Sequence, residues 1–152
     1  MTGVEADKKA VSVFQYNMGQ NLAFSVQRLG ILYGSVTEEG WVKVEVIYEP
    51  PQENTAHGVL LHSKEAQLAH ADALATALGL SRVGVIIGQT AEDYEDEEFV
   101  LSSSQMLLIA SLRPKKEKKD DDDPPFVILT VGGTPRSPTL AISFTKHTLS
   151  TH

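Results

Sequence analysis

The sequence predicts a single α/β domain in which helices cover a mixed β-sheet. Three observations lead to this fold class. Segments with the apolar period of a helix alternate along the 152-residue chain with short apolar runs typical of strands. Glycine or proline stands between several of these segments. The length suits one domain that buries a substantial core.

The N-terminal third predicts a helix and then a hairpin. We expect residues 1–13 to form a flexible segment, because most of them are polar. From Phe14 to Arg28, apolar side chains recur at every fourth position, which is the spacing of one helix face. Leu29–Val36 and Trp41–Tyr48 then predict two antiparallel strands around a turn at Glu38-Glu39-Gly40. In the second strand, Val42, Val44 and Val46 alternate with Lys43, Glu45 and Ile47.

The middle third predicts a loop, a helix and a buried strand. Pro50-Pro51 ends the hairpin, and a polar loop is expected to continue to about His62. Ser63 is a candidate N-cap for a helix over Lys64–Leu78. Gly79 is a candidate for the residue with left-handed backbone angles that ends this helix. Arg82–Gly88 is an apolar run of the length of a buried strand.

The C-terminal third predicts one more helix and two more strands. After a short Phe99–Leu101 segment, Ser102 and Gln105 have the spacing of a capping box at the start of a helix over Ser103–Leu112. Phe126–Val131 and Leu140–Phe144 are the last predicted strands, joined by a loop that contains Gly132-Gly133. The predicted order is therefore helix, two strands, helix, strand, helix and two strands.

These segments define one domain over residues 14–145, with charged loop insertions near 91–98 and 114–125 and a tail over 146–152. The net charge of −7 lies mainly in the six acids of 92–98, so the body of the domain offers no basic surface for nucleic acid. No apolar stretch is long enough for membrane insertion, and the N-terminus does not resemble a secretory signal. The chain has no cysteine, which excludes thiol chemistry and cysteine-bound zinc.

Motifs for nucleophilic, phosphate-binding or metal chemistry are missing from the sequence. It contains no G-x-S-x-G elbow and no Walker loop, and its five histidines do not occur in H-x-H or H-E-x-x-H spacing. The sequence motifs therefore indicate no candidate catalytic residue and no site for a cofactor.

Four short sequence motifs resemble segments of the MPN domain of the nuclear protein localization protein 4 family. They are RLGILYG at 28–34, VIYEPPQ at 46–52, GLSRVGVI at 79–86 and LSS at 101–103. The resemblance runs from about Phe14 to Phe144, and its most diagnostic motif is I-Y-E-P-P-Q. It implies a three-layer MPN (JAMM-type) sandwich with a mixed sheet flanked by helices.

The resemblance also implies that the domain is catalytically inactive. Active MPN proteins are zinc isopeptidases in which two histidines and an aspartate hold the metal and a glutamate acts as general base. In this sequence the glutamate position is Gln27, the histidine positions are Ile87 and Gln89, and the aspartate position is Gln105. Neither an isoleucine side chain nor this set of amides is a good zinc site, so these four are vestigial positions and no metal is expected.

A catalytically inactive isopeptidase fold in this family implies ubiquitin binding. The expected partners are ubiquitin or ubiquitin chains and, through the full-length protein, the ubiquitin-fusion-degradation partner and the valosin-containing AAA ATPase. The implied role is delivery of ubiquitinated proteins to that unfoldase for extraction and proteasomal degradation, in the cytoplasm and nucleus and peripherally at the endoplasmic reticulum membrane. Candidate residues for binding an extended polypeptide are Val59, Leu60, Leu61 and Ile87.

Alternatives remain open at this stage. Packing of Val59–Leu61 against the helix that follows them is the other interpretation of this segment, and the sequence favours it. A scaffold-only MPN domain that holds partner subunits is the second function, and a metal hydrolase with displaced ligands such as His57 and His62 is the third. The family also carries a ubiquitin-like domain and cysteine-rich zinc modules that this sequence lacks, so we expect an excised domain or a shortened relative.

Overall fold

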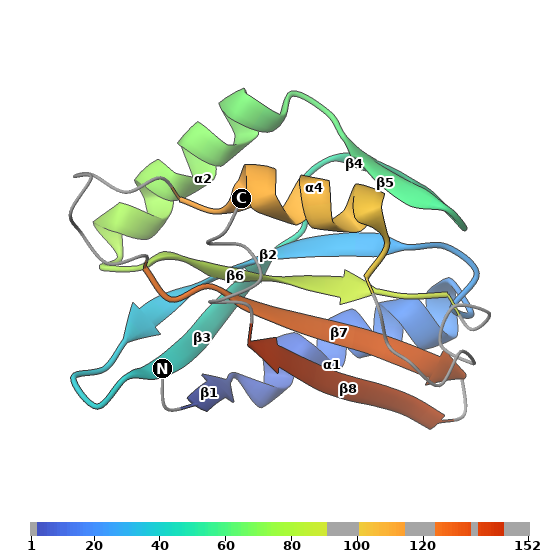
Figure 1. The fold of residues 1–152 in the computed structure, drawn as a ribbon, viewed down its shortest axis with the longest axis horizontal. Helices are drawn as coiled ribbons and strands as arrows, with labels where there is room; N and C mark the ends of the chain where they lie inside the picture. Colours follow the sequence, from blue (N-terminus) through green and yellow to red (C-terminus); the bar gives the residue numbers. More distant parts are fainter. Residues whose placement is uncertain (1–2, 91–100, 115–123, 135–136, 145–152) are drawn as a thin grey trace.

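Six strands form one mixed sheet that has helices on both faces (Figure 1). The computed structural model describes residues 3–90, 101–114, 124–134 and 137–144. The strand order is β1-β3-β2-β6-β7-β8, and neighbours are antiparallel except for the parallel pairs β1/β3 and β6/β7. The strands of this sheet are β1 (Gly3–Ala6), β2 (Arg28–Val36), β3 (Trp41–Tyr48), β6 (Ser81–Gly88), β7 (Val127–Thr134) and β8 (Ser137–Phe144). The predicted mixed α/β class is confirmed.

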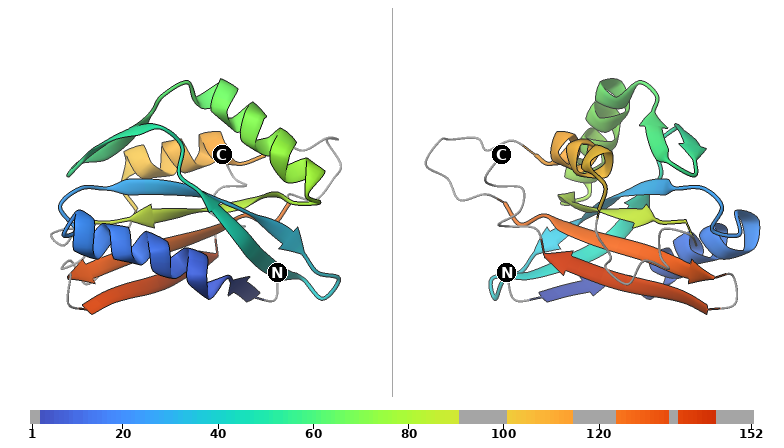
Figure 2. Two further views of the ribbon diagram at one scale, coloured as in Figure 1. Left: turned by 180° about the vertical axis from the view of Figure 1, so that it is seen from behind. Right: turned by 45° about the vertical axis from the view of Figure 1, so that its right-hand side comes forward.

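The helices divide the core into two clusters, one on each side of the sheet (Figure 2). Helix α1 (Lys8–Tyr16) supplies Phe14 to the first cluster, which includes Leu32 and Ile86 from the central strands. Helices α2 (Lys64–Ala77) and α4 (Ser103–Leu112) cover the second cluster, which includes Ile31 and Ile87. Within the described ranges, no helix is both long and apolar enough to cross a lipid bilayer.

The N-terminal helix lies earlier than the sequence pattern predicted. The expectation of a flexible segment over residues 1–13 is wrong for Gly3 onward, because β1 pairs with β3 and α1 begins at Lys8. The helical stripe starts at Val11 and continues through Phe14 to Met18, the last of which lies in a π-helical turn over Asn17–Asn21. Positive φ angles at Ala23 and Phe24 then turn the chain, so the predicted helix does not continue to Arg28.

The predicted hairpin of β2 and β3 is confirmed, but a β-bulge changes which side chains are buried. Tyr33 pairs with Val46 and Gly34 pairs with Val44, which leaves Glu45 as an extra residue. The alternation therefore changes phase at Glu45, and Ile47 rather than Val46 packs against the first core cluster. The expectation that Val46 continues the buried face of β3 is wrong, since its side chain is exposed.

A second hairpin replaces the polar loop that was expected after Pro51. Strands β4 (Gln52–Thr55) and β5 (Gly58–Leu61) pair with each other as a separate two-stranded sheet. The predicted helix over 64–78 and its left-handed stop are confirmed, because α2 ends at Ala77 and Gly79 has a φ of 76°. Ser63 is not a side-chain cap, since it adopts a left-handed conformation and makes no capping hydrogen bond.

The C-terminal elements follow the prediction with one exception. Ser102 and Gln105 form the predicted capping box at the start of α4. Gly132-Gly133 does not lie in a loop, because both residues belong to β7 and pair with Thr139 and Pro138 of β8. The short segment at 99–100, most of the charged insertions and the tail over 146–152 lie outside the described residues.

One polar cluster joins α2 and α4 to the sheet. The Tyr33 hydroxyl on β2 donates to Asp72 Oδ1 of α2 at 2.7 Å, and Arg82 Nε on β6 contacts the same oxygen at 3.1 Å. Arg82 Nη1 also donates to the carbonyl oxygen of Leu112 at the end of α4, at 2.6 Å. Burial, followed by the hydrogen bond to Asp72, raises the pKa of Tyr33 above its ordinary value of 10.0.

We predict that alanine at Gly34 destabilises the domain, because its Cβ would lie 1.7 Å from the Lys43 carbonyl oxygen at the bulge. The expected loss in the free energy of unfolding is about 2 kcal/mol or more. Gly58→Ala is the matched control, since a Cβ there meets nothing within 4 Å, and its expected effect is below about 0.5 kcal/mol. Urea denaturation of both variants measures the difference, and equal effects would contradict the bulge geometry.

We also predict that the stabilisation provided by the Tyr33 hydroxyl is lost in alkaline solution. The unfolded chain releases this proton near pH 10, whereas the raised pKa keeps folded Tyr33 protonated, so the contribution is complete below about pH 10 and falls above it. The melting temperature of the parent should exceed that of Tyr33→Phe near neutral pH, and the gap should narrow from about pH 9 to pH 11. A gap that stays constant over this range would argue against the Tyr33–Asp72 contact.

Candidate functional site

The structure brings together, at one end of the sheet, the four positions that the resemblance marked as vestigial: Gln27, Ile87, Gln89 and Gln105. Arg28 pairs with Gly88, so Gln27 before β2 and Gln89 after β6 lie side by side. Gln105, in the first turn of α4, lies above them. Ile87 is the penultimate residue of β6 and belongs to the second core cluster. These four residues, which come from three separate segments of the sequence, therefore lie close together in the structure.

The three glutamines form a buried hydrogen-bonded group. Gln105 Nε2 donates to Gln89 Oε1 at 2.9 Å and to Gln27 Oε1 at 3.1 Å. Gln105 Oε1 accepts from the backbone N–H of Ser102 at 2.9 Å and from Gln89 Nε2 at 3.2 Å. The exposed fractions of Gln27, Gln89 and Gln105 are 5%, 4% and 6%. Gln105 thus has two donated and two accepted bonds, which satisfies a buried carboxamide fully.

This donor set does not fit zinc. Catalytic zinc sites use imidazole nitrogens and carboxylate oxygens as ligands and keep one position for water. Here the corresponding positions hold amides that bond to one another, and Ile87 is a core side chain with 2% exposure. Across the described part of the chain, no three His, Cys, Asp or Glu side chains are grouped in a way that would hold a metal. His62 Nε2 lies 3.7 Å from Glu53 Oε1.

A small pocket of about 140 Å³ adjoins the glutamine group. Its floor comes from Leu29 of β2 and Ile87 of β6, one wall comes from β5, and the other comes from α4. The lining residues are Gln27, Leu29, His57, Gly58, Val59, Ile87, Ser104, Gln105 and Leu108. We call this space the amide pocket.

The amide pocket contains two of the four candidate binding residues. Val59 and Ile87 line it, whereas Leu61 packs against the second core cluster and Leu60 is 59% exposed on the hairpin. Since Val59 also packs against that cluster, the alternative in which this segment supports the core holds for Leu61 and in part for Val59. Sequence reasoning missed Ser104 and Leu108, although Leu108 lies three residues after Gln105 and so shares its helix face.

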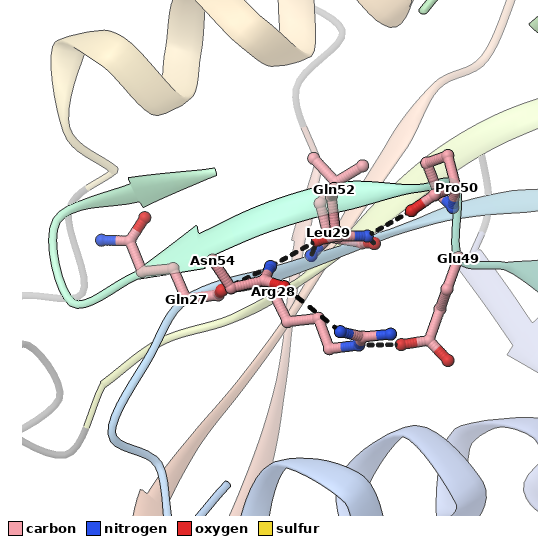
Figure 3. Close-up of polar contacts among 7 residues, drawn as sticks. All are labelled: Gln27, Arg28, Leu29, Glu49, Pro50, Gln52 and Asn54. Carbon is pink, nitrogen blue, oxygen red and sulfur yellow. Dashed lines mark hydrogen bonds and ion pairs between the residues drawn. The ribbon is translucent and has the colours of Figure 1, made fainter. Parts of the chain in front are cut away.

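The β4–β5 hairpin is held against the start of β2 by side chains (Figure 3). The Gln52 carboxamide bonds both backbone groups of Leu29, and Asn54 Nδ2 donates to the carbonyl oxygen of Gln27 at 2.9 Å. Arg28 forms an ion pair with Glu49. The I-Y-E-P-P-Q motif therefore contributes Glu49 and Gln52, which hold this region against β2.

A second hollow of about 410 Å³ lies between α2 and the end of β3. Val46 and Tyr48 line it from the sheet side, and Leu74 of α2 and Leu78, the residue after α2, line it from the other side. The bulge at Glu45 turns Val46 toward this hollow, which leaves an apolar, partly exposed surface away from the amide pocket.

Comparison with solved structures supports the fold. The solution structure of protein DSY2949 from Desulfitobacterium hafniense superposes with a TM-score of 0.62, covering 95% of this chain and 86% of that one. The two sequences are 15% identical, so this likeness concerns the fold alone.

Comparison with known sequences places the chain in a family. NPL4-like protein 2 of Arabidopsis thaliana is 42% identical over 99 residues, which is 65% of this chain and 24% of that protein. The Nuclear protein localization protein 4 homolog of Dictyostelium discoideum is 32% identical over 92 residues, which is 60% of this chain and 16% of that protein. The chain thus spans about a quarter or less of the length of these relatives. The family model described as "NPL4 family" matches residues 28–111, more than half of the sequence. The chain belongs to the NPL4 family.

Proposed function

We propose that this chain is a catalytically inactive MPN domain that binds ubiquitin within an NPL4-type adaptor. The observation that carries the proposal is the buried, hydrogen-bonded group of Gln27, Gln89 and Gln105, at positions that the sequence resemblance aligns with the zinc site of active isopeptidases. These amides bond to one another rather than presenting ligands, and an apolar pocket adjoins them. The site therefore offers a pocket for a ligand, while its amides are engaged with one another and do not present a zinc site.

The amide pocket suits an apolar side chain of an extended polypeptide. Because the carboxamide of Gln105 is satisfied internally, an apolar group can enter without breaking a hydrogen bond in it. The volume of about 140 Å³ is close to that of cavities of roughly 150 Å³ that hold a benzene ring. A leucine or phenylalanine side chain has this size.

Strand β5 offers a main-chain partner beside this pocket. Among the described residues, β5 pairs only with β4, so its other edge is open to strand addition. An extended segment that pairs with such an edge gains affinity from backbone hydrogen bonds and specificity from alternate side chains. We propose that an unfolded segment of ubiquitin binds here, between β5 and α4.

In the full-length protein this domain would act together with the ubiquitin-fusion-degradation partner and the valosin-containing AAA ATPase. Its role would be to help deliver ubiquitinated proteins to that unfoldase for extraction and proteasomal degradation. The proposed cellular location is the cytoplasm and nucleus, and in ER-associated degradation the protein would act peripherally at the endoplasmic reticulum membrane.

A scaffold function is the second candidate, and the hollow between α2 and β3 favours it. Leu74 and Leu78 are 59% and 74% exposed beside this apolar surface. Exposed apolar side chains around a hollow are typical of contact surfaces between proteins. In this case the domain would hold neighbouring subunits through α2, and the amide pocket would have no ligand.

We predict that the purified chain retains less than about 0.1 equivalent of zinc after dialysis and does not cleave ubiquitin chains. A variant that combines Gln27→Glu, Ile87→His, Gln89→His and Gln105→Asp is the positive control, because it restores the ligand types at positions that lie together. That variant should take up zinc toward about one equivalent by elemental analysis. A stoichiometric content of zinc in the parent would contradict the assignment of an inactive site.

We predict that Leu108→Glu weakens capture of ubiquitin chains about tenfold in the assembled adaptor complex, because it introduces a charge into the wall of the amide pocket. Leu107→Glu is the matched control, since Leu107 is the neighbouring residue on α4, is 73% exposed and does not line the pocket. Ser104→Trp is a second variant that fills the pocket from an exposed position. Thermal melts check folding, and capture that is unchanged in both pocket variants would favour the scaffold function.

A further inference from the structure

The start of β2 lacks a partner from β3. The ladder between these strands ends at the pair Ile31 and Tyr48, after which Pro50-Pro51 carries the chain away from the sheet. Leu29 still pairs with Ile87 on its other side, but beyond Tyr48 no strand residue of β3 lies opposite it. The backbone groups of Leu29 that face this side must be satisfied in another way because the residue is fully buried.

The side chain of Gln52 takes the place of the missing strand partner. Its Oε1 accepts from the backbone N–H of Leu29 at 2.9 Å, and its Nε2 donates to the carbonyl oxygen of Leu29 at 2.8 Å. This is the same exchange of two hydrogen bonds that a residue of an antiparallel strand would make. The remaining capacity of the carboxamide is also used, because Nε2 donates to Pro50 at 3.0 Å and Oε1 accepts from Asn54 at 2.7 Å.

The rest of the hairpin attachment also depends largely on side chains. Asn54 Nδ2 donates to the carbonyl oxygen of Gln27, and Arg28 Nη1 donates to Asn54 Oδ1 at 3.3 Å. A backbone bond also joins the hairpin to the residue before β2, from the N–H of Gln27 to the carbonyl oxygen of Thr55 at 2.8 Å. The hairpin is therefore anchored to the sheet through Gln52 and Asn54 of β4. The hairpin residues Gly58 and Val59, which line the amide pocket, lie on the next strand, β5.

We infer that Gln52 is a positioning residue for polypeptide binding, in that its carboxamide holds the β4–β5 hairpin as a preformed wall of the amide pocket. The inference rests on the proposed function. Gly58 and Val59 line the pocket from a hairpin whose first strand is fixed at Leu29, which is itself a lining residue. A wall that is already ordered spares the ligand the loss of conformational freedom on binding, so releasing it weakens binding.

The test substitutes Gln52→Met, which keeps the length of the side chain and removes its hydrogen bonds. Glu53→Met is the matched control on the same strand, where the exposed side chain contacts only His62 among the interactions described for it. Amide hydrogen exchange of the chain reports the hairpin directly, without ubiquitin. We expect exchange over 52–61 to be at least about tenfold faster in Gln52→Met than in Glu53→Met, with β6 and β7 still protected.

Capture of ubiquitin chains by the assembled adaptor complex gives the second readout, and we expect a loss of about tenfold for Gln52→Met alone. Unchanged exchange in the hairpin overturns the inference whatever the binding result. Faster exchange with unchanged capture also overturns it, provided that Leu108→Glu reduces capture. A failure of the proposed function is recognised separately, because Leu108→Glu would then leave capture unchanged as well.

Discussion

A buried amide must find hydrogen-bond partners, and this requirement links the separate parts of the domain. Gln52 bonds the backbone of Leu29 in β2, and Asn54 bonds Gln52 and the carbonyl oxygen of Gln27. The side chain of Gln27 then accepts from Gln105, which bonds Gln89. The hairpin, the central strands and α4 are thus connected by one set of carboxamides, and the position of each depends on the others.

Under the proposed function, this network explains how a site without zinc ligands keeps a defined shape. In an active isopeptidase a metal ion would join the end of the sheet to the helix above it, whereas here Gln105 joins them through Ser102, Gln89 and Gln27. The amides face each other and leave apolar walls on the adjoining pocket. Binding of polypeptide without hydrolysis is the activity that such an arrangement supports best.

Local sequence patterns were enough to predict the central strands, α2, and α4 with its capping box. The spacing of apolar residues and the identity of helix-capping residues can both be recognised within a few positions. The bulge at Glu45 was not predictable, since it depends on the close approach of Gly34 to Lys43 across the sheet. The β4–β5 hairpin was missed because its polar side chains bond to a distant strand. At the site, the resemblance located Gln27, Ile87, Gln89 and Gln105, but only the fold shows that the amides pair and that Ile87 is core.

Site-specific photocrosslinking tests most directly whether the amide pocket receives ubiquitin. A benzophenone amino acid would replace Ser104, which lines the pocket, or Leu107, which is exposed on the same helix outside it. With ubiquitin chains bound to the assembled adaptor complex, position 104 should crosslink to one short continuous segment of ubiquitin, and position 107 should crosslink weakly or not at all. Efficient capture of chains with no crosslink from position 104, or with equal crosslinks from both positions, would contradict a polypeptide-binding groove between β5 and α4.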